Sequence, residues 1–138
     1  MEKKIYIASD HAGYEMKAKL CDYFKTLIDL GTNSNESVDY PDFAYKLTSK
    51  VSQNNDSFGI LICGTGVGMS IAANREKRIR AGLVNSSEIA RLVRQHNDAN
   101  VLVLPGRFMK EEEAKKCIQI FLETEFEVGR HKQRVDKL

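Results

Sequence analysis

Five short apolar runs alternate along the chain with stretches that have the periodicity of amphipathic helices. The runs are KKIYIAS, TLIDLG, FGILIC, IRAGLV and NVLVLP, and each ends in small or polar residues. Because these strands are apolar almost without interruption, both faces of the sheet must be covered, which is typical of parallel sheets. We therefore expect an α/β fold in which two layers of helices sandwich a parallel sheet of about five strands.

Helical stripes and cap signals fall between the predicted strands. The stripes are Leu20, Cys21, Phe24 and Leu27; Phe43, Ala44, Leu47 and Val51; and Ala114, Cys117, Ile118, Phe121 and Leu122. Pro41 suits the first turn of the second helix, and Asn85 with Glu88 predicts the N-cap of another. The charged segment 129–138, GRHKQRVDKL, reads by its composition as a solvated basic tail. With no linker or repeat, we expect a single domain over residues 1–138.

Charge, apolar length and cysteine spacing exclude several classes of protein. A formal net charge of +2, with basic and acidic residues interleaved, does not favour nucleic-acid binding. No apolar stretch approaches the roughly 20 residues of a membrane span, and the N-terminus lacks a signal-peptide core. Cys21, Cys63 and Cys117 are far apart and form no C-x-x-C pair, so we expect neither disulfides nor a zinc site. A reducing cytoplasm is the expected location.

Polar residues follow the predicted strands, at the edge where open parallel sheets bind their ligands. These residues are Ser9, Asp10 and His11, residues 63–68, Asn85 and Ser86, and Arg107. They are the first candidates for a functional site.

The glycine-rich turn CGTGVG, residues 63–68, is the most specific of these signals. Glycines permit positive φ and close approach, so that successive N–H groups can converge on an anion just before a helix. The turn is neither a P-loop nor a thiol-phosphatase loop, because Met69 stands where the first needs lysine and the second arginine. The spacing is also not G-x-G-x-x-G, and no acidic residue closes the strand IRAGLV, which disfavours a dinucleotide cofactor.

Cys63 has two interpretations. It could be a small apolar side chain at the end of a buried strand, as Cys21 and Cys117 are within their helical stripes. At the junction of strand and turn, however, converging N–H groups should favour the thiolate and lower the pKa of Cys63 from about 8.5. Such a thiol could remove and return a proton.

The other candidates also have plain alternatives. His96 could be a hydrogen-bonded core histidine, Asp10 a helix N-cap, and Thr65 a turn residue. Three arginines could individually be surface charges: Arg107, Arg130 and Arg134. Taken together, a thiol, an anion cradle, histidines and separated arginines indicate acid–base chemistry on a phosphorylated molecule.

Several motifs together resemble the type B ribose-5-phosphate isomerases, a family related to galactose-6-phosphate and allose-6-phosphate isomerases. The motifs are SDHAG, DLGTNS, DYPDFA, ILICGTGVGMSIAAN, RQHNDAN and GRHKQRV, in that family's order and nearly from end to end of the chain. The resemblance implies a Rossmann-like αβα sandwich and a phosphorylated sugar as substrate, with no metal or redox cofactor. It also implies a homodimer, or a dimer of dimers forming a tetramer, whose active sites are built from both subunits.

By this resemblance, Cys63 is the base that moves a proton between C1 and C2, Thr65 assists proton exchange between the two oxygens, and His96 opens the sugar ring. The turn that would hold the enediolate oxygens comprises Gly64, Thr65, Gly66, Val67 and Gly68. The expected sugar contacts are Asp10, Tyr40 and Asn97. The expected phosphate pocket is His11, Arg107, Arg130 and Arg134, so that segment 129–138 completes it. Arg107 and the segment around His96 are expected to enter from the neighbouring subunit.

The resemblance also separates close alternatives. One branch of the family lacks the cysteine and has a glutamate base where this chain has Met69, so Cys63 points to the cysteine branch. Galactose-6-phosphate isomerases divide these residues between two unlike subunits, whereas this chain carries them together. We therefore expect interconversion of ribose 5-phosphate and ribulose 5-phosphate, with an allose-6-phosphate or galactose-6-phosphate isomerase as the alternative. A sugar-phosphate sensor that binds without catalysis is the rival from another class.

Overall fold

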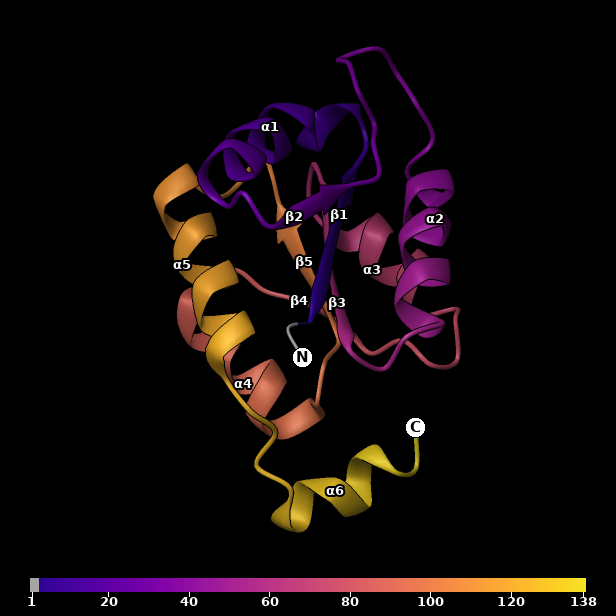
Figure 1. Ribbon diagram of the computed structural model, residues 1–138, viewed down its shortest axis with the longest axis vertical. Coiled ribbons are helices and arrows are strands. Elements are labelled where there is room, and N and C mark those ends of the chain that lie inside the picture. Colours follow the sequence, from indigo (N-terminus) through magenta and orange to yellow (C-terminus); the bar gives the residue numbers. More distant parts are fainter. Residues whose placement is uncertain (1–2) are drawn as a thin grey trace.

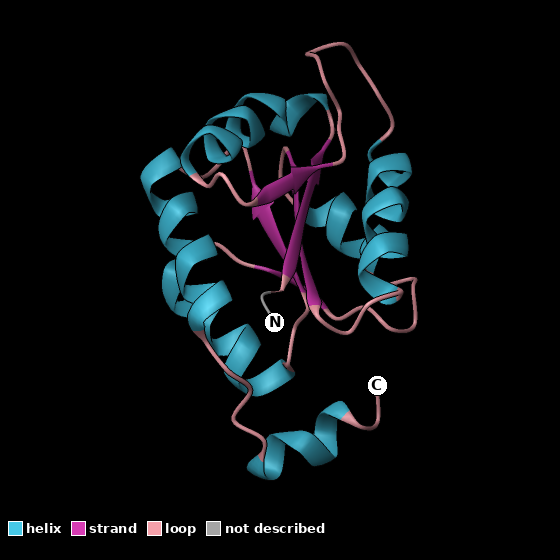
Figure 2. Cartoon of the chain, viewed as in Figure 1, coloured by secondary structure: helices cyan, strands magenta, loops and turns pink. Residues whose placement is uncertain are grey.

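Five parallel strands form one sheet in the order β2-β1-β3-β5-β4 (Figure 2). The computed structural model of the protein describes residues 3–138. The strands are β1 (Lys4–Ser9), β2 (Leu27–Asp29), β3 (Ser57–Cys63), β4 (Ala81–Leu83) and β5 (Val101–Pro105). Each of them coincides with one predicted apolar run, except that β3 begins one residue earlier, at Ser57, and this confirms the parallel sheet.

Helices cover both faces of the sheet and make the predicted three-layer sandwich (Figure 1). One face carries α1 (Tyr14–Tyr23), α4 (Ser87–Asn97) and α5 (Glu111–Glu123), and the other carries α2 (Tyr40–Ser52) and α3 (Val67–Ala73). A short 3-10 helix, η1 (His11–Gly13), joins β1 to α1, and α6 (Gly129–Val135) lies near the end of the chain. Within residues 3–138, no helix combines the length and apolar character needed to span a membrane.

Successive residues of β3 alternate between two halves of the core. Ile60 and Ile62 pack among the side chains of α1, α4 and α5, whereas Leu61 and Cys63 pack among those of α2 and α3. Every residue of β3 is buried, which explains why its sequence is apolar without interruption. Cys63 is therefore turned toward the side of the sheet that carries α3.

Two local predictions from the sequence are wrong. Phe24 and Leu27 do not belong to the first helical stripe, because α1 ends before them and Leu27 pairs with β1 as the first residue of β2. Strand pairing here overrides a pattern that fits a helix. The N-cap of α4 is Ser86 rather than Asn85, and the Ser86 hydroxyl accepts the N–H of Ile89 at 3.3 Å.

Segment 129–138 is not a solvated tail throughout. It forms α6, in which His131 is buried among charged neighbours. The chain leading into α6 is fixed to α4, since Nε of Arg94 donates to the carbonyl of Thr124 at 3.0 Å. The basic residues of this segment are thus presented on an ordered helix.

Lys17 is buried within α1 and paired with Asp29 at the end of β2. Its exposed fraction is 1%, and its Nζ lies 2.8 and 2.7 Å from the two Asp29 carboxylate oxygens. In Asp29→Ala, a buried ammonium would lose its anion, so we expect the free energy of unfolding to fall by about 2–4 kcal/mol. Urea unfolding followed by circular dichroism measures this loss.

Asp22→Ala is the matched control for this variant. Asp22 pairs with Lys25 at 3.2 Å on the exposed surface, where an ion pair contributes little to stability. We expect the control to unfold almost like the wild type. Equal losses in the two variants would contradict the importance of the buried pair.

Candidate active site

Loops from three strands meet at the carboxyl edge of the sheet. η1 follows β1, residues 64–68 follow β3, and Arg107 follows β5. Backbone hydrogen bonds connect two of these loops: the N–H of Gly106 donates to the carbonyl of Cys63 at 2.8 Å, and that of Arg107 to the carbonyl of Gly64 at 3.0 Å. We call the predicted site residues here the carboxyl-edge group: Asp10, His11, Tyr40, Cys63, Gly64, Thr65, Gly66, Val67, Gly68 and Arg107.

The turn between β3 and α3 depends on two of its glycines. Gly66 has φ +80°, and a Cβ added there would collide with Leu83 and lie 3.4 Å from the backbone of Leu104. A Cβ at Gly68 would lie 2.7 Å from the ring of Tyr40. The predicted turn and helix start are therefore confirmed, and Tyr40 packs directly against the first turn of α3.

Two predicted side chains also act as local caps. The Thr65 hydroxyl accepts the N–H of Val67 at 3.2 Å, and the Asp10 carboxylate accepts the N–H of Gly13 at 3.0 Å. Thr65 is therefore a turn residue, as its plain alternative predicts, whereas Asp10 caps the short helix η1 and Gly13 stands at the N-cap of α1. These contacts also fix both side chains at the carboxyl edge.

Cys63 is the thiol that lies at this edge. It is 5% exposed, as the last residue of β3. Burial and the nearby Asp29 carboxylate raise the pKa of Cys21, and burial raises the pKa of Cys117 to about 12. Those two thiols stay protonated at neutral pH and lie within helices, so neither is suited to proton transfer.

His11 and Arg107 line one cavity of about 430 Å³ at the carboxyl edge. The Nδ1 of His11 accepts the N–H of Val38 at 3.2 Å, so a neutral ring carries its proton on Nε2 and can donate from there. A Cβ added at Gly64 would lie 3.4 Å from Nη1 of Arg107. Within one chain the guanidinium of Arg107 thus lies beside the turn of residues 64–68, and the expectation that it reaches a neighbouring subunit stays a prediction. An imidazole and a guanidinium on one cavity suit a phosphate group.

The remaining predicted residues gather where α4 ends and α6 packs. A second cavity of about 270 Å³ is lined there by His96, Asn97, His131 and Arg134. His96 is half-buried, and its ring stacks on that of His131 with centroids 4.3 Å apart and 18° between the planes. We call these residues, with Arg130 of the same helix, the helix-end group: His96, Asn97, Arg130, His131 and Arg134.

His131 is the residue of this group that sequence reasoning missed. Its exposed fraction is 8%, and burial, together with the electrostatic effect of neighbouring His96 and Arg130, lowers the pKa of His131. Its ring is therefore neutral at pH 7. The available signal was its spacing of four residues from Val135, which places both on one face of a helix.

Among residues 3–138, one set of side chains comes close to the requirements of a metal ion: His96, Glu127 and His131. Their ligand atoms lie within 4.8 Å of one another. The two imidazole rings are stacked, however, so their lone pairs run side by side and do not converge on a single point. The arrangement favours a stacked histidine pair over a metal centre.

The carboxyl-edge and helix-end groups lie at opposite edges of the sheet. α4 starts beyond the carboxyl end of β4 and runs back for 11 residues, about 16 Å, to finish near the amino end of β5. Figure 1 shows α6 at the end of the molecule opposite η1 and α1. One chain therefore contains both groups but does not bring Cys63 and His96 together.

Comparisons with known proteins find full-length matches in both sequence and fold. The model of the Ribose/Galactose Isomerase family matches residues 5–138. The ribose-5-phosphate isomerase B of Escherichia coli is 43% identical, with 99% of this chain and 94% of that protein covered. A ribose 5-phosphate isomerase structure from Thermotoga maritima superposes with a TM-score of 0.96 at 50% identity, covering 99% of this chain and 97% of that one.

A second solved structure carries a ligand. Ribose-5-phosphate isomerase B from Mycoplasma genitalium, with bound ribulose-5-phosphate, superposes with a TM-score of 0.95 at 47% identity. The superposition covers 99% of this chain and 94% of that chain. The fold, the glycine turn with its cysteine and these full-length matches together show that the chain belongs to the ribose/galactose isomerase family.

Proposed function

We propose that the protein interconverts ribose 5-phosphate and ribulose 5-phosphate as an aldose–ketose isomerase. The observation that carries this function is the full-length similarity to ribose-5-phosphate isomerase B proteins, one of which has a structure with bound ribulose-5-phosphate. The chemistry of the carboxyl-edge group supports the same reaction. A thiol beside an anion-binding turn offers a base for proton transfer and hydrogen-bond donors for a negatively charged intermediate.

In the proposed reaction, the Cys63 thiolate removes the proton from C2 of the open-chain aldose, and a cis-enediolate results. The thiol then returns the proton to C1, while Thr65 assists transfer of the hydroxyl proton between O1 and O2. Such a base contributes about 10²- to 10⁴-fold in rate. Backbone N–H groups of residues 64–68 stabilise the enediolate oxygens, and one comparable donor in an oxyanion site contributes about 3–4 kcal/mol.

The aldose must first be opened from its furanose form. His96 is proposed to supply a proton to the ring oxygen and to accept one from the O1 hydroxyl. The proposed contacts to sugar hydroxyls are Asp10, Tyr40 and Asn97. The proposed phosphate ligands are His11, Arg107, Arg130 and Arg134, so that segment 129–138 completes the pocket of one domain spanning the chain.

A second copy of the chain has to supply half of each site. We propose a homodimer, able to pair into a tetramer, in which the carboxyl-edge group of one protomer meets the helix-end group of its partner. The distance between Cys63 and the end of α4 within one chain supports this, because ring opening and proton transfer act on the same substrate. The free thiols of all three cysteines support a reducing, cytoplasmic location.

The purified protein is expected to convert ribose 5-phosphate to ribulose 5-phosphate in the presence of EDTA. The conversion is followed by the absorbance of the ketose, and exchange of the C2 proton of ribose 5-phosphate is followed by NMR in heavy water. Binding of ribose 5-phosphate with no exchange would contradict the isomerase and favour a sensor. Faster turnover of allose 6-phosphate or galactose 6-phosphate in the same assay would instead favour a hexose-phosphate isomerase.

A further inference from the structure

α4 ends one residue after His96, and the chain leaves it through a left-handed residue. Asp98 has φ 48° and ψ 44°, a conformation that aspartate tolerates better than most side chains. The N–H of Asp98 donates to the carbonyl of Arg94 at 3.2 Å, and that of Ala99 to the carbonyl of Val93 at 3.0 Å. The direction in which His96 projects therefore depends on how firmly this helix end is held.

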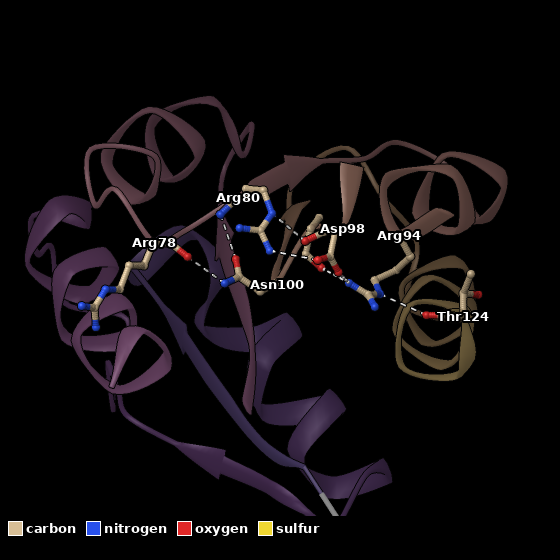
Figure 3. Close-up of polar contacts among 7 residues, drawn as sticks. Arg78, Arg80, Arg94, Asp98, Asn100 and Thr124 are labelled. Carbon is tan, nitrogen blue, oxygen red and sulfur yellow. Dashed lines mark hydrogen bonds and ion pairs between the residues drawn. The ribbon is translucent and has the colours of Figure 1, made fainter. Parts of the chain in front are cut away.

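Two arginines hold the Asp98 carboxylate: Arg94 of α4, and Arg80 of the segment that precedes β4 (Figure 3). Nη1 of Arg94 lies 2.9 Å from Oδ1, and Nη2 of Arg80 lies 3.3 Å from Oδ2. Nε of Arg80 also donates to the backbone carbonyl of Asp98 at 2.8 Å. We call these three residues the Asp98 clamp: Arg80, Arg94 and Asp98.

The clamp is itself anchored on both sides. Arg94 is 7% exposed, its Nη1 donates to the carbonyl of Ala99 at 2.7 Å, and its guanidinium lies 4.9 Å from the ring centroid of Phe58. On the other side, the N–H of Arg80 donates to Oδ1 of Asn100 at 2.8 Å (Figure 3). Asp98 is thus held by the segment that leads into β4 and by α4. Partly buried ion pairs of this kind are weakly screened by salt.

We propose that Asp98 is a positioning residue for ring opening: the clamp fixes the end of α4 so that His96 and Asn97 meet the substrate in one orientation. The inference rests on the proposed function, in which these two side chains act on the sugar. Asp98 itself lies outside the second cavity that they line. A displacement of about 1 Å in such a group can reduce a rate about 100-fold, which is why the holding contacts matter for catalysis as well as for folding.

The test compares two reactions of the intact protein. Ribose 5-phosphate must be opened before it reacts, whereas ribulose 5-phosphate has its O5 phosphorylated and stays acyclic, so deuterium exchange at its C1 needs only the Cys63 step. In Asp98→Asn, which keeps a side chain that tolerates the left-handed backbone, we expect kcat/KM for ribose 5-phosphate to fall about 10- to 100-fold. Exchange at C1 of ribulose 5-phosphate should stay within about twofold of the wild type.

Three further variants make the result decisive. Arg80→Gln removes one of the two arginines that hold Asp98. Its kcat/KM for ribose 5-phosphate should fall less than that of Asp98→Asn, with C1 exchange of ribulose 5-phosphate again unchanged, and this variant is informative even if Asp98→Asn folds poorly. His96→Ala should show the largest loss of kcat/KM for ribose 5-phosphate relative to C1 exchange of ribulose 5-phosphate. Asp22→Asn is the matched control, because Asp22 is also a carboxylate near a helix C-terminus, paired with Lys25, and it should leave both reactions unchanged.

Each remaining outcome overturns the proposal. If the rates of both reactions fall together in Asp98→Asn and Arg80→Gln, the clamp contributes only to folding. If neither rate falls, the clamp does not position His96 or Asn97. If His96→Ala keeps the full rate, Asp98 has no ring-opening group to hold. A wild-type protein that catalyses neither reaction would refute the proposed function as well, and this result is distinct from the other three.

Discussion

Replacing Cys63 with alanine is expected to lower kcat for ribose 5-phosphate by about 10²- to 10⁴-fold. Alanine has no group that can accept the C2 proton, while its small size fits the buried end of β3, so the loss should come without a large loss of stability. Stopped assays of ribulose 5-phosphate formation measure the rate. Deuterium exchange at C1 of ribulose 5-phosphate should disappear in parallel, because the same base serves both directions.

Cys21→Ala is the control for this substitution. Cys21 is a half-buried thiol of α1, and burial raises its pKa, so its removal should leave turnover unchanged. Near wild-type turnover in Cys63→Ala would show that another group is the base, even though the fold and family remain the same. Both proteins are compared at equal folded concentration, which thermal unfolding curves establish.

Mixing two inactive variants should restore activity if each site joins two chains. A heterodimer of Cys63→Ala and His96→Ala contains one site in which both residues are intact and one in which both are missing. With random pairing, half of the dimers are mixed and half of their sites are complete, so we expect about a quarter of the wild-type activity. The two proteins are refolded together from denaturant and assayed with ribose 5-phosphate.

A mixture of Cys63→Ala and Arg107→Ala is the matched control. Both residues belong to the carboxyl-edge group of one chain, so every site in the mixed dimer carries one defect and activity should not return. If the first mixture forms dimers by light scattering but stays inactive, each site must lie within one chain. Recovery in the control mixture would equally refute the shared site.

The strands and the glycine turn could be predicted because their signals are local. An uninterrupted apolar run such as FGILIC requires burial on both faces, and β3 is buried at each residue. Glycine at residue 66 is required by a positive φ that few other residues adopt. The cap of α4 was misplaced by one residue because Asn85 and Ser86 carry similar signals, and only the hydrogen bond to Ile89 distinguishes them.

The features that could not be predicted from the sequence depend on contacts between segments far apart in the chain. His131 lies in a run of charges whose composition favours solvent, yet it is buried against His96, 35 positions earlier in the chain. The turn that carries Arg107 folds back on Gly64, which no local pattern indicates. The topology alone could have predicted one further feature. A helix that starts at the carboxyl edge of a parallel sheet must end at the amino edge, and this rule places His96, near the end of α4, at the amino edge.

The opposite placement of the carboxyl-edge and helix-end groups has a consequence for how related sequences vary together. In a dimer of the proposed kind, a change near Cys63 is compensated by a change at the end of α4 in the partner, although the two positions lie at opposite edges of the sheet within their own chain. Correlated substitutions among relatives would then link pairs of positions that no single copy of the fold can bring into contact. In a contact map of the monomer such pairs would appear as false contacts, but they would in fact mark the interface between two protomers.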